Sequence, residues 1–168
     1  MKLFGRKEKV VPVVAKEGRW DVEYRRPDDG ENVIRINQRN PKGFNERLFE
    51  FVPVAGVSYR EKDVVAFIDG VDRELSLRRE YVDEVHPDAL AVWGLWKDGG
   101  KSQAARFGFV PREVNDAIGA RPVAATLVAM YRPMKDKGPG LRMDIWGTRS
   151  KKWGGKGVDA EMQKSPLV

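Results

Sequence analysis

The feature that most constrains the fold is a succession of short apolar or alternating segments separated by turn residues. Alternation with period two, clearest in residues 74–78 and 141–146, is typical of half-buried strands. Turn residues such as those of 26–30 (Arg-Pro-Asp-Asp-Gly) and 98–100 (Asp-Gly-Gly) separate these segments. We therefore predict strands at residues 20–24, 33–36, 48–57, 74–78, 89–96, 104–110, 123–132 and 141–146. No internal repeat and no βαβ alternation is visible.

Two segments have helix signals instead. In residues 63–70, Asp63 is a candidate N-cap and Gly70 a candidate C′ residue, although residues 64–68 are also compatible with a buried strand. In residues 111–119, Pro111 suits the first helical position and Gly119 ends the segment. The predicted class is all-β with two short helices, as an antiparallel barrel or sandwich.

The 168 residues suffice for one domain with a core and ordered extensions. We divide the chain into a basic arm (1–18), an N-terminal β-hairpin extension (19–47), a β-barrel domain (48–149) and a flexible basic tail (150–168). No stretch reaches the roughly 20 apolar residues that cross a bilayer, so we expect a cytoplasmic protein without membrane contact. The sequence does not indicate an oligomeric state.

Several kinds of chemistry lack their residues. The chain has no cysteine and one histidine, which excludes disulfides and the usual zinc sites. There is no phosphate-binding glycine motif of the P-loop or Rossmann type. His86 precedes a proline in a charged loop and is expected at the surface, and the acidic pairs 28–29 and 83–84 lie in turns. We expect neither catalysis nor a cofactor.

The net charge of +6 is concentrated at the two ends of the chain. Residues 1–50 hold 12 basic and 9 acidic side chains, residues 51–131 hold 10 and 12, and residues 132–168 hold 9 and 4. Basic flanks attract phosphate backbones without reading sequence, but the same charge is compatible with simple solubility.

Four segments stand in a characteristic order: Val54–Arg60, Glu74–Glu80, Pro87–Val92 and Phe107–Glu113. Together they resemble the HIRAN domain, over about 95 residues if the last strand pair is included. The resemblance implies an OB-like antiparallel β-barrel that captures single-stranded DNA, in the best-known members by its free 3′ end. It also implies a helicase or other ATPase as a possible partner protein.

The resemblance assigns four candidate site residues, and a departure from the family pattern adds a fifth. Tyr59 matches an aromatic of the first strand that packs on the terminal nucleotide, and Asp88 matches the acid that binds the 3′-hydroxyl. Arg112 matches a basic residue near the phosphates, and Phe109 a position at the same pocket edge. Arg60 stands where the family has a second aromatic, and it is a candidate phosphate contact.

Each of these residues also has a structural interpretation. Tyr59 is compatible with a core or rim aromatic, Asp88 with a loop cap, and Arg112 with an ion pair to a nearby acid. Of Trp93 and Trp96, we assign one to the core and the other to a possible exposed platform. The expected function is binding of single-stranded DNA, and the alternatives are RNA binding in the same groove or a protein-interaction module.

Overall fold

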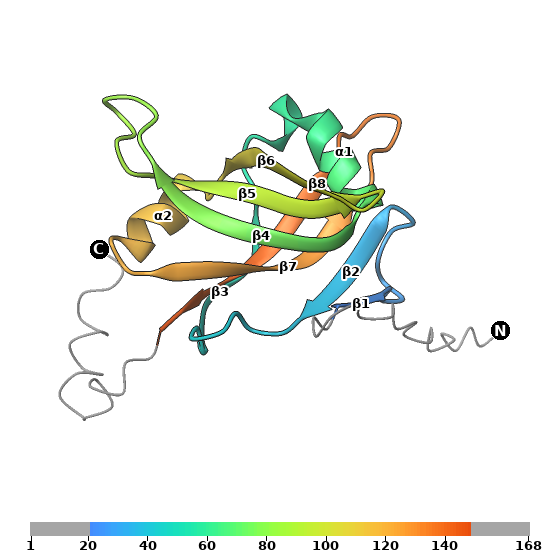
Figure 1. The fold of residues 1–168 in the computed structure, drawn as a ribbon, viewed down its shortest axis with the longest axis horizontal. Coiled ribbons are helices and arrows are strands. Elements are labelled where there is room, and N and C mark those ends of the chain that lie inside the picture. Colours follow the sequence, from blue (N-terminus) through green and yellow to red (C-terminus); the bar gives the residue numbers. More distant parts are fainter. Residues whose placement is uncertain (1–20, 149–168) are drawn as a thin grey trace.

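The computed structural model describes residues 21–148, which form mostly antiparallel strands and two short α-helices, as predicted (Figure 1). The strands are β1 (Asp21–Tyr24), β2 (Val33–Gln38), β3 (Glu46–Pro53), β4 (Val71–Glu80), β5 (Ala89–Asp98), β6 (Lys101–Phe109), β7 (Val123–Tyr131) and β8 (Gly140–Gly147). The helices are the 3₁₀ turn η1 (Val57–Tyr59), α1 (Glu61–Asp69) and α2 (Arg112–Ile118). The predicted arm (1–18) and tail (150–168) lie outside the described residues.

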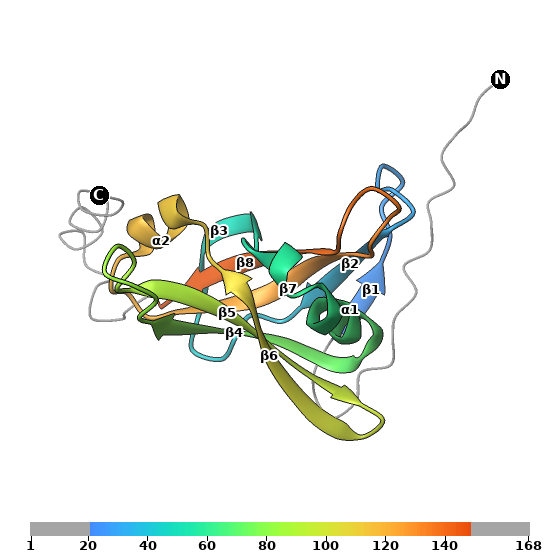
Figure 2. The ribbon, with the colours of Figure 1, turned by 90° about the horizontal axis from the view of Figure 1, so that it is seen from above.

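Strand pairing defines two sheets, one of five strands in the order β1-β2-β7-β8-β3 and one of three in the order β4-β5-β6. The β1–β2 hairpin, predicted as an extension, continues the larger sheet because β2 pairs with β7. The β5–β6 hairpin extends away from the larger sheet (Figure 2). No helix within residues 21–148 has the length and apolar character to cross a membrane.

One hydrophobic core is shared by the two sheets and α1. At its centre the rings of Phe67, Trp96 and Phe107 meet, with Phe67 edge-on to the other two at 5.8 and 4.9 Å between centroids. Gly94 makes room for this cluster, since a Cβ there would lie 2.0 Å from the ring of Phe107. The core therefore fixes how β5 and β6 lie over α1.

A short backbone contact joins the two sheets at one end. Ala55, just beyond β3, exchanges two hydrogen bonds with Phe109 at the end of β6, with N···O distances of 2.8 and 2.9 Å. The preceding residue, Val54, donates its N–H to the carbonyl of Leu141 on β8, at 3.2 Å. The segment after β3 thus contacts both sheets through consecutive residues.

Several predicted boundaries are wrong, among them the end of one strand and the starts of both helices. The strand predicted to reach residue 57 ends at Pro53, because Gly56 takes a left-handed φ of 86° and starts η1. Helix α1 begins at Glu61 rather than at an Asp63 cap, and its N-cap residue makes no side-chain capping bond. Pro111 is the N-cap of α2, with an extended ψ of 143°, rather than its first helical residue. The strand alternative for 64–68 is also wrong, since these residues belong to α1.

Candidate nucleic-acid interface

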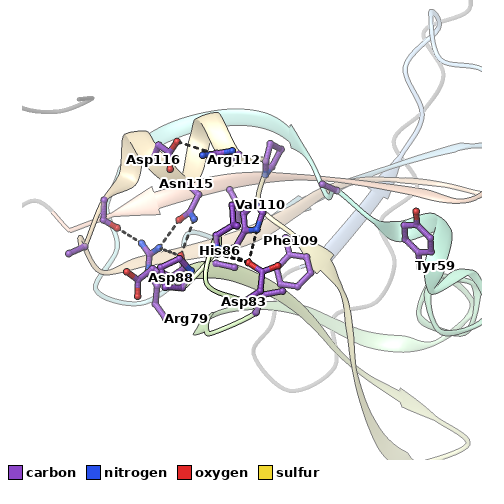
Figure 3. Close-up of a pocket in the computed structure, with 18 residues that line it drawn as sticks. Tyr59, Arg79, Asp83, His86, Asp88, Phe109, Val110, Arg112, Asn115 and Asp116 are labelled. Carbon is purple, nitrogen blue, oxygen red and sulfur yellow. Dashed lines mark hydrogen bonds and ion pairs between the residues drawn. The ribbon is translucent and has the colours of Figure 1, made fainter.

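A pocket of about 1600 Å³, shown in Figure 3, opens beside the Ala55–Phe109 bridge, and both bridge residues line it. Three segments line it: the connection after β3 with η1, the end of β4 with the following loop, and the end of β6 with α2. Of the five predicted site residues, four line this pocket, namely Tyr59, Asp88, Phe109 and Arg112. Arg60 does not line it.

Arg79 and Asn115 hold the loop of residues 81–88 against α2. Arg79 Nη1 donates to Asn115 Oδ1 at 2.6 Å and to the carbonyl of Asp88 at 3.2 Å, and Nη2 donates to the carbonyl of Gly119. Asn115 Nδ2 also donates to the Asp88 carbonyl, at 3.0 Å. We did not predict Arg79 and Asn115 as site residues. The only feature of the sequence that could have indicated them is their residue type, because a guanidinium and an amide can each bind several carbonyl groups at once.

Asp88 is anchored through its backbone, and its carboxylate remains available. Within residues 21–148 the carboxylate makes no hydrogen bond and no ion pair. The loop-capping role considered for Asp88 belongs to Asp83, whose Oδ1 accepts from the N–H groups of Val85 and His86 at 2.9 and 2.7 Å. The backbone N–H of His86 lowers the pKa of Asp83, and its ring adds to the effect. His86 is exposed, as predicted.

The two aromatic residues of the pocket occupy different positions. Tyr59 lies on η1, not on a strand as predicted, and is 88% exposed, which excludes the core interpretation. In Figure 3 it lies apart from the other labelled side chains, across the pocket mouth. Phe109 is half-buried at the end of β6, and the guanidinium carbon of Arg106 lies 5.2 Å from its ring centroid. Both rings offer apolar surface to the pocket.

The lining of the pocket carries two arginines and three aspartates, so acidic side chains outnumber basic ones. Arg112 is the first residue of α2, is exposed, and lies 3.9 Å from Asp116, measured from Nε to Oδ2. A pair at that distance on an exposed surface contributes little, so the guanidinium stays available. Arg79 is the second basic group, and Asp83 and Asp88 add to the acidic ones. The pocket is therefore not a basic patch.

The rim of the pocket carries exposed apolar side chains. On the loop after β4, Tyr81, Val82 and Val85 are 67%, 45% and 69% exposed. Val82 and Val85 line the pocket, as does Tyr59 on the opposite side. Exposed apolar side chains gathered around a pocket are typical of interaction sites.

The tryptophan assignment is confirmed for one residue. Trp96 is 6% exposed and belongs to the core cluster. Trp93 is half-buried, and the guanidinium carbon of Arg78 lies 4.7 Å from its ring centroid.

Within residues 21–148, no three histidine or acidic side chains gather as metal ligands. No family model, curated protein or solved structure matches the chain.

Proposed function

We propose that this chain is a nucleic-acid-binding module with an OB-like fold of the HIRAN type, and that it captures a free 3′ end of single-stranded DNA without catalysing a reaction. The observation that carries the proposal is the pocket, because it gathers Tyr59, Asp88, Phe109 and Arg112 from three distant segments. The order of the elements that supply the four motifs is compatible with such a fold.

Each group has a role that suits its chemistry. The free carboxylate of Asp88 accepts a hydrogen bond from a terminal hydroxyl and repels a phosphate at the same position. The rings of Tyr59 and Phe109 provide faces for bases, and Arg112 provides a guanidinium for the neighbouring phosphate. A site of this kind distinguishes an end from an internal linkage.

The test is a fluorescence-anisotropy titration with labelled single strands that end in a 3′-hydroxyl, end in a 3′-phosphate or are circular, at two salt concentrations. The proposal expects the 3′-hydroxyl strand to bind most tightly. Equal affinity for all three strands would contradict end capture and leave only electrostatic attraction. Titration with an RNA strand of the same sequence shows whether the pocket binds ribose or deoxyribose strands more tightly.

The variant Asp88→Asn tests the contribution of the Asp88 carboxylate. In this variant the ratio of the affinities for 3′-hydroxyl and 3′-phosphate strands should fall about ten- to 100-fold, which is the contribution of a hydrogen bond to a charged group. The matched control is Asp98→Asn, which removes an exposed carboxylate from the end of β5, outside the pocket lining. An unchanged preference in Asp88→Asn would show that the role assigned to Asp88 is wrong.

A protein-interaction module is the second candidate, favoured by the exposed Tyr81, Val82 and Val85 at the rim. Absence of any binding to single-stranded DNA or RNA at low salt would favour it over the first. In that case the partner would contact the apolar rim rather than the carboxylate of Asp88.

A further inference from the structure

The outer face of the three-stranded sheet carries a row of aromatic and arginine side chains that leads to the pocket. Directly opposite residues of paired strands lie on the same face of a sheet. Trp93 is opposite Arg106, and Ala91 is opposite both Arg78 and Phe109. A bulge in β6 leaves Phe107 out of the register with β5, and so places Arg106 and Phe109 on this same face although they are three residues apart. We name Arg78, Glu80, Trp93 and Arg106, together with Phe109 at its end, the sheet strip.

Glu80 fixes the geometry of the sheet strip. Its Oε1 accepts a hydrogen bond from Trp93 Nε1 at 2.7 Å, and its Oε2 accepts one from Arg106 Nη1 at 2.9 Å. Burial raises the pKa of Glu80, but the bonds from Arg106 and Trp93 outweigh it and leave the pKa below its ordinary value. The charged glutamate thus holds the indole and one guanidinium in a fixed relation.

A guanidinium group lies over each of the two aromatic rings of the sheet strip. The guanidinium carbon of Arg78 lies 4.7 Å from the centroid of Trp93, and that of Arg106 lies 5.2 Å from the centroid of Phe109. Arg78 is exposed, and no hydrogen bond or ion pair with residues 21–148 fixes its guanidinium there. The face of Trp93 is therefore covered by a group that can move away without breaking such a bond.

From this arrangement we infer that the sheet strip is a second base-stacking subsite, which binds the nucleotides that precede the captured end. A base replaces the guanidinium of Arg78 on Trp93, and Arg78 turns to a phosphate of the same strand. Phe109 belongs to both the pocket and the sheet strip, so the two subsites are continuous. The inference rests on the proposed function, since it extends the same strand beyond the pocket.

If the sheet strip binds the preceding nucleotides, the affinity of the chain for single-stranded DNA depends on the length of the strand. A strand that fills only the pocket gains nothing from Trp93, whereas a longer one adds a stacked base and a phosphate contact. Single-strand sites on OB folds span about 4–16 nucleotides, which leaves room for such an extension. Selectivity for the end stays with Asp88 and does not depend on the sheet strip.

The test measures the affinities of oligothymidylates of two, four, six and eight nucleotides with a 3′-hydroxyl, by competition in fluorescence anisotropy. The unaltered chain should gain about 5- to 150-fold on lengthening beyond the pocket, the contribution of one stacked base. Trp93→Leu should lose that gain and keep the preference for a hydroxyl end. Arg78→Glu, at an exposed position of β4, should lose the gain as well.

Phe51→Leu is the matched control. The guanidinium carbons of Arg35 and Arg142 lie 4.6 and 5.4 Å from the ring centroid of Phe51, so this ring resembles that of Trp93. Phe51 itself lies on β3, in the larger sheet. The control should keep the full gain with length, and circular dichroism and thermal unfolding establish that each variant is folded.

An unchanged gain with length in both Trp93→Leu and Arg78→Glu would overturn the sheet strip while leaving end capture intact. Failure of the unaltered chain to bind any of the oligonucleotides would overturn the proposed function, and the sheet strip with it.

Discussion

At Gly108 the backbone of β6 passes against the carbonyl of Ala55, with no space for a side chain. A Cβ at this position would lie 1.9 Å from that oxygen, which belongs to backbone and cannot turn away. The same oxygen accepts the N–H of Phe109 at 2.9 Å, so the close approach is part of the bridge between the sheets. Glycine is required here for space, since Gly108 is not among the residues with positive φ.

Gly108→Ala should lower the free energy of unfolding by about 1–3 kcal/mol, the typical cost of forcing extra volume into a packed site. Urea unfolding followed by circular dichroism measures the change. Ser102→Ala, at an exposed position of the same strand, is the control and should change stability by less than about 0.5 kcal/mol. Equal stability of Gly108→Ala and the unaltered chain would contradict the assigned role of the bridge.

Glu80 has a pH-dependent effect on stability. Because its pKa is lowered in the folded state, its contribution is present above the pKa of an unfolded glutamate, about 4.3, and is lost as the pH falls through the native value. Glu80→Gln should therefore be less stable than the unaltered chain at pH 7, with a difference that shrinks below pH 4. Urea unfolding of both proteins at several pH values measures this, and a constant difference would contradict it.

Among single residues, four of the five predicted site residues line one pocket, and their role in binding stays a prediction. Tyr59, Asp88, Phe109 and Arg112 do line one pocket, because the motif order reflects segments that the fold brings together. Tyr59 was expected on a strand, but the left-handed conformation of Gly56 turns the chain into η1 first. A glycine in an apolar run does not reveal its φ, and so the sequence could not predict that turn.

At the scale of elements, the alternation of side chains was a sufficient guide to the strands. All eight predicted strands overlap observed ones, and both predicted helices are present. The errors lie at the ends, where the pattern is weakest: β4 continues to Val71 and Glu80 beyond the alternating residues 74–78. The Arg79–Asn115 contact was not predictable, because it joins residues 36 positions apart across two elements.

This contact supplies a prediction for the loop of residues 81–88. Asn115→Ala removes the hydrogen bonds to Arg79 and to the carbonyl of Asp88, so the loop should lose protection in hydrogen exchange while the strands keep theirs. Because Asp88 is then less well placed, affinity for a 3′-hydroxyl end should fall about tenfold. Asn37→Ala, at an exposed position of β2, should change neither quantity. Unaltered exchange in the loop would contradict the role of Asn115.

At the scale of the whole molecule, the net charge is unevenly distributed along the chain. Residues 21–148 contain 20 basic and 21 acidic side chains, a net charge of −1, whereas the whole chain carries +6. The remaining residues at the two ends therefore carry +7, which is the difference between +6 and −1. In the proposed function, attraction to phosphate comes mainly from residues 1–20 and 149–168, whereas discrimination between ends comes from the pocket within residues 21–148.

Replacing Lys151, Lys152 and Lys156 with glutamine should therefore weaken binding of all single strands at low salt. The slope of log K against log salt should become shallower by up to about 2, at roughly 0.7 per lost contact with a single strand. The ratio of affinities for hydroxyl and phosphate ends should not change. Anisotropy titrations over a range of salt concentrations measure both quantities, and a changed ratio would contradict the division of roles.

The arrangement of the sheets could not be derived from the sequence. Local alternation predicts that a segment is a strand but does not specify its neighbours, and the pairs β2–β7 and β3–β8 join segments nearly 100 residues apart. We predicted residues 19–47 as an extension because a hairpin signal is local, whereas its pairing with β7 is not.

The bridge between Ala55 and Phe109 has a practical consequence, because both residues also line the pocket. An occupant that touches both residues is held by parts of the two sheets at once, so it must be released before the sheets separate. Any such compound should raise the melting temperature of the whole domain, whatever its chemical class, by an amount that grows with the logarithm of its concentration relative to its dissociation constant. Thermal-shift screening of unlabelled oligonucleotides, peptides and small molecules would therefore find the natural occupant in whichever of these classes it belongs.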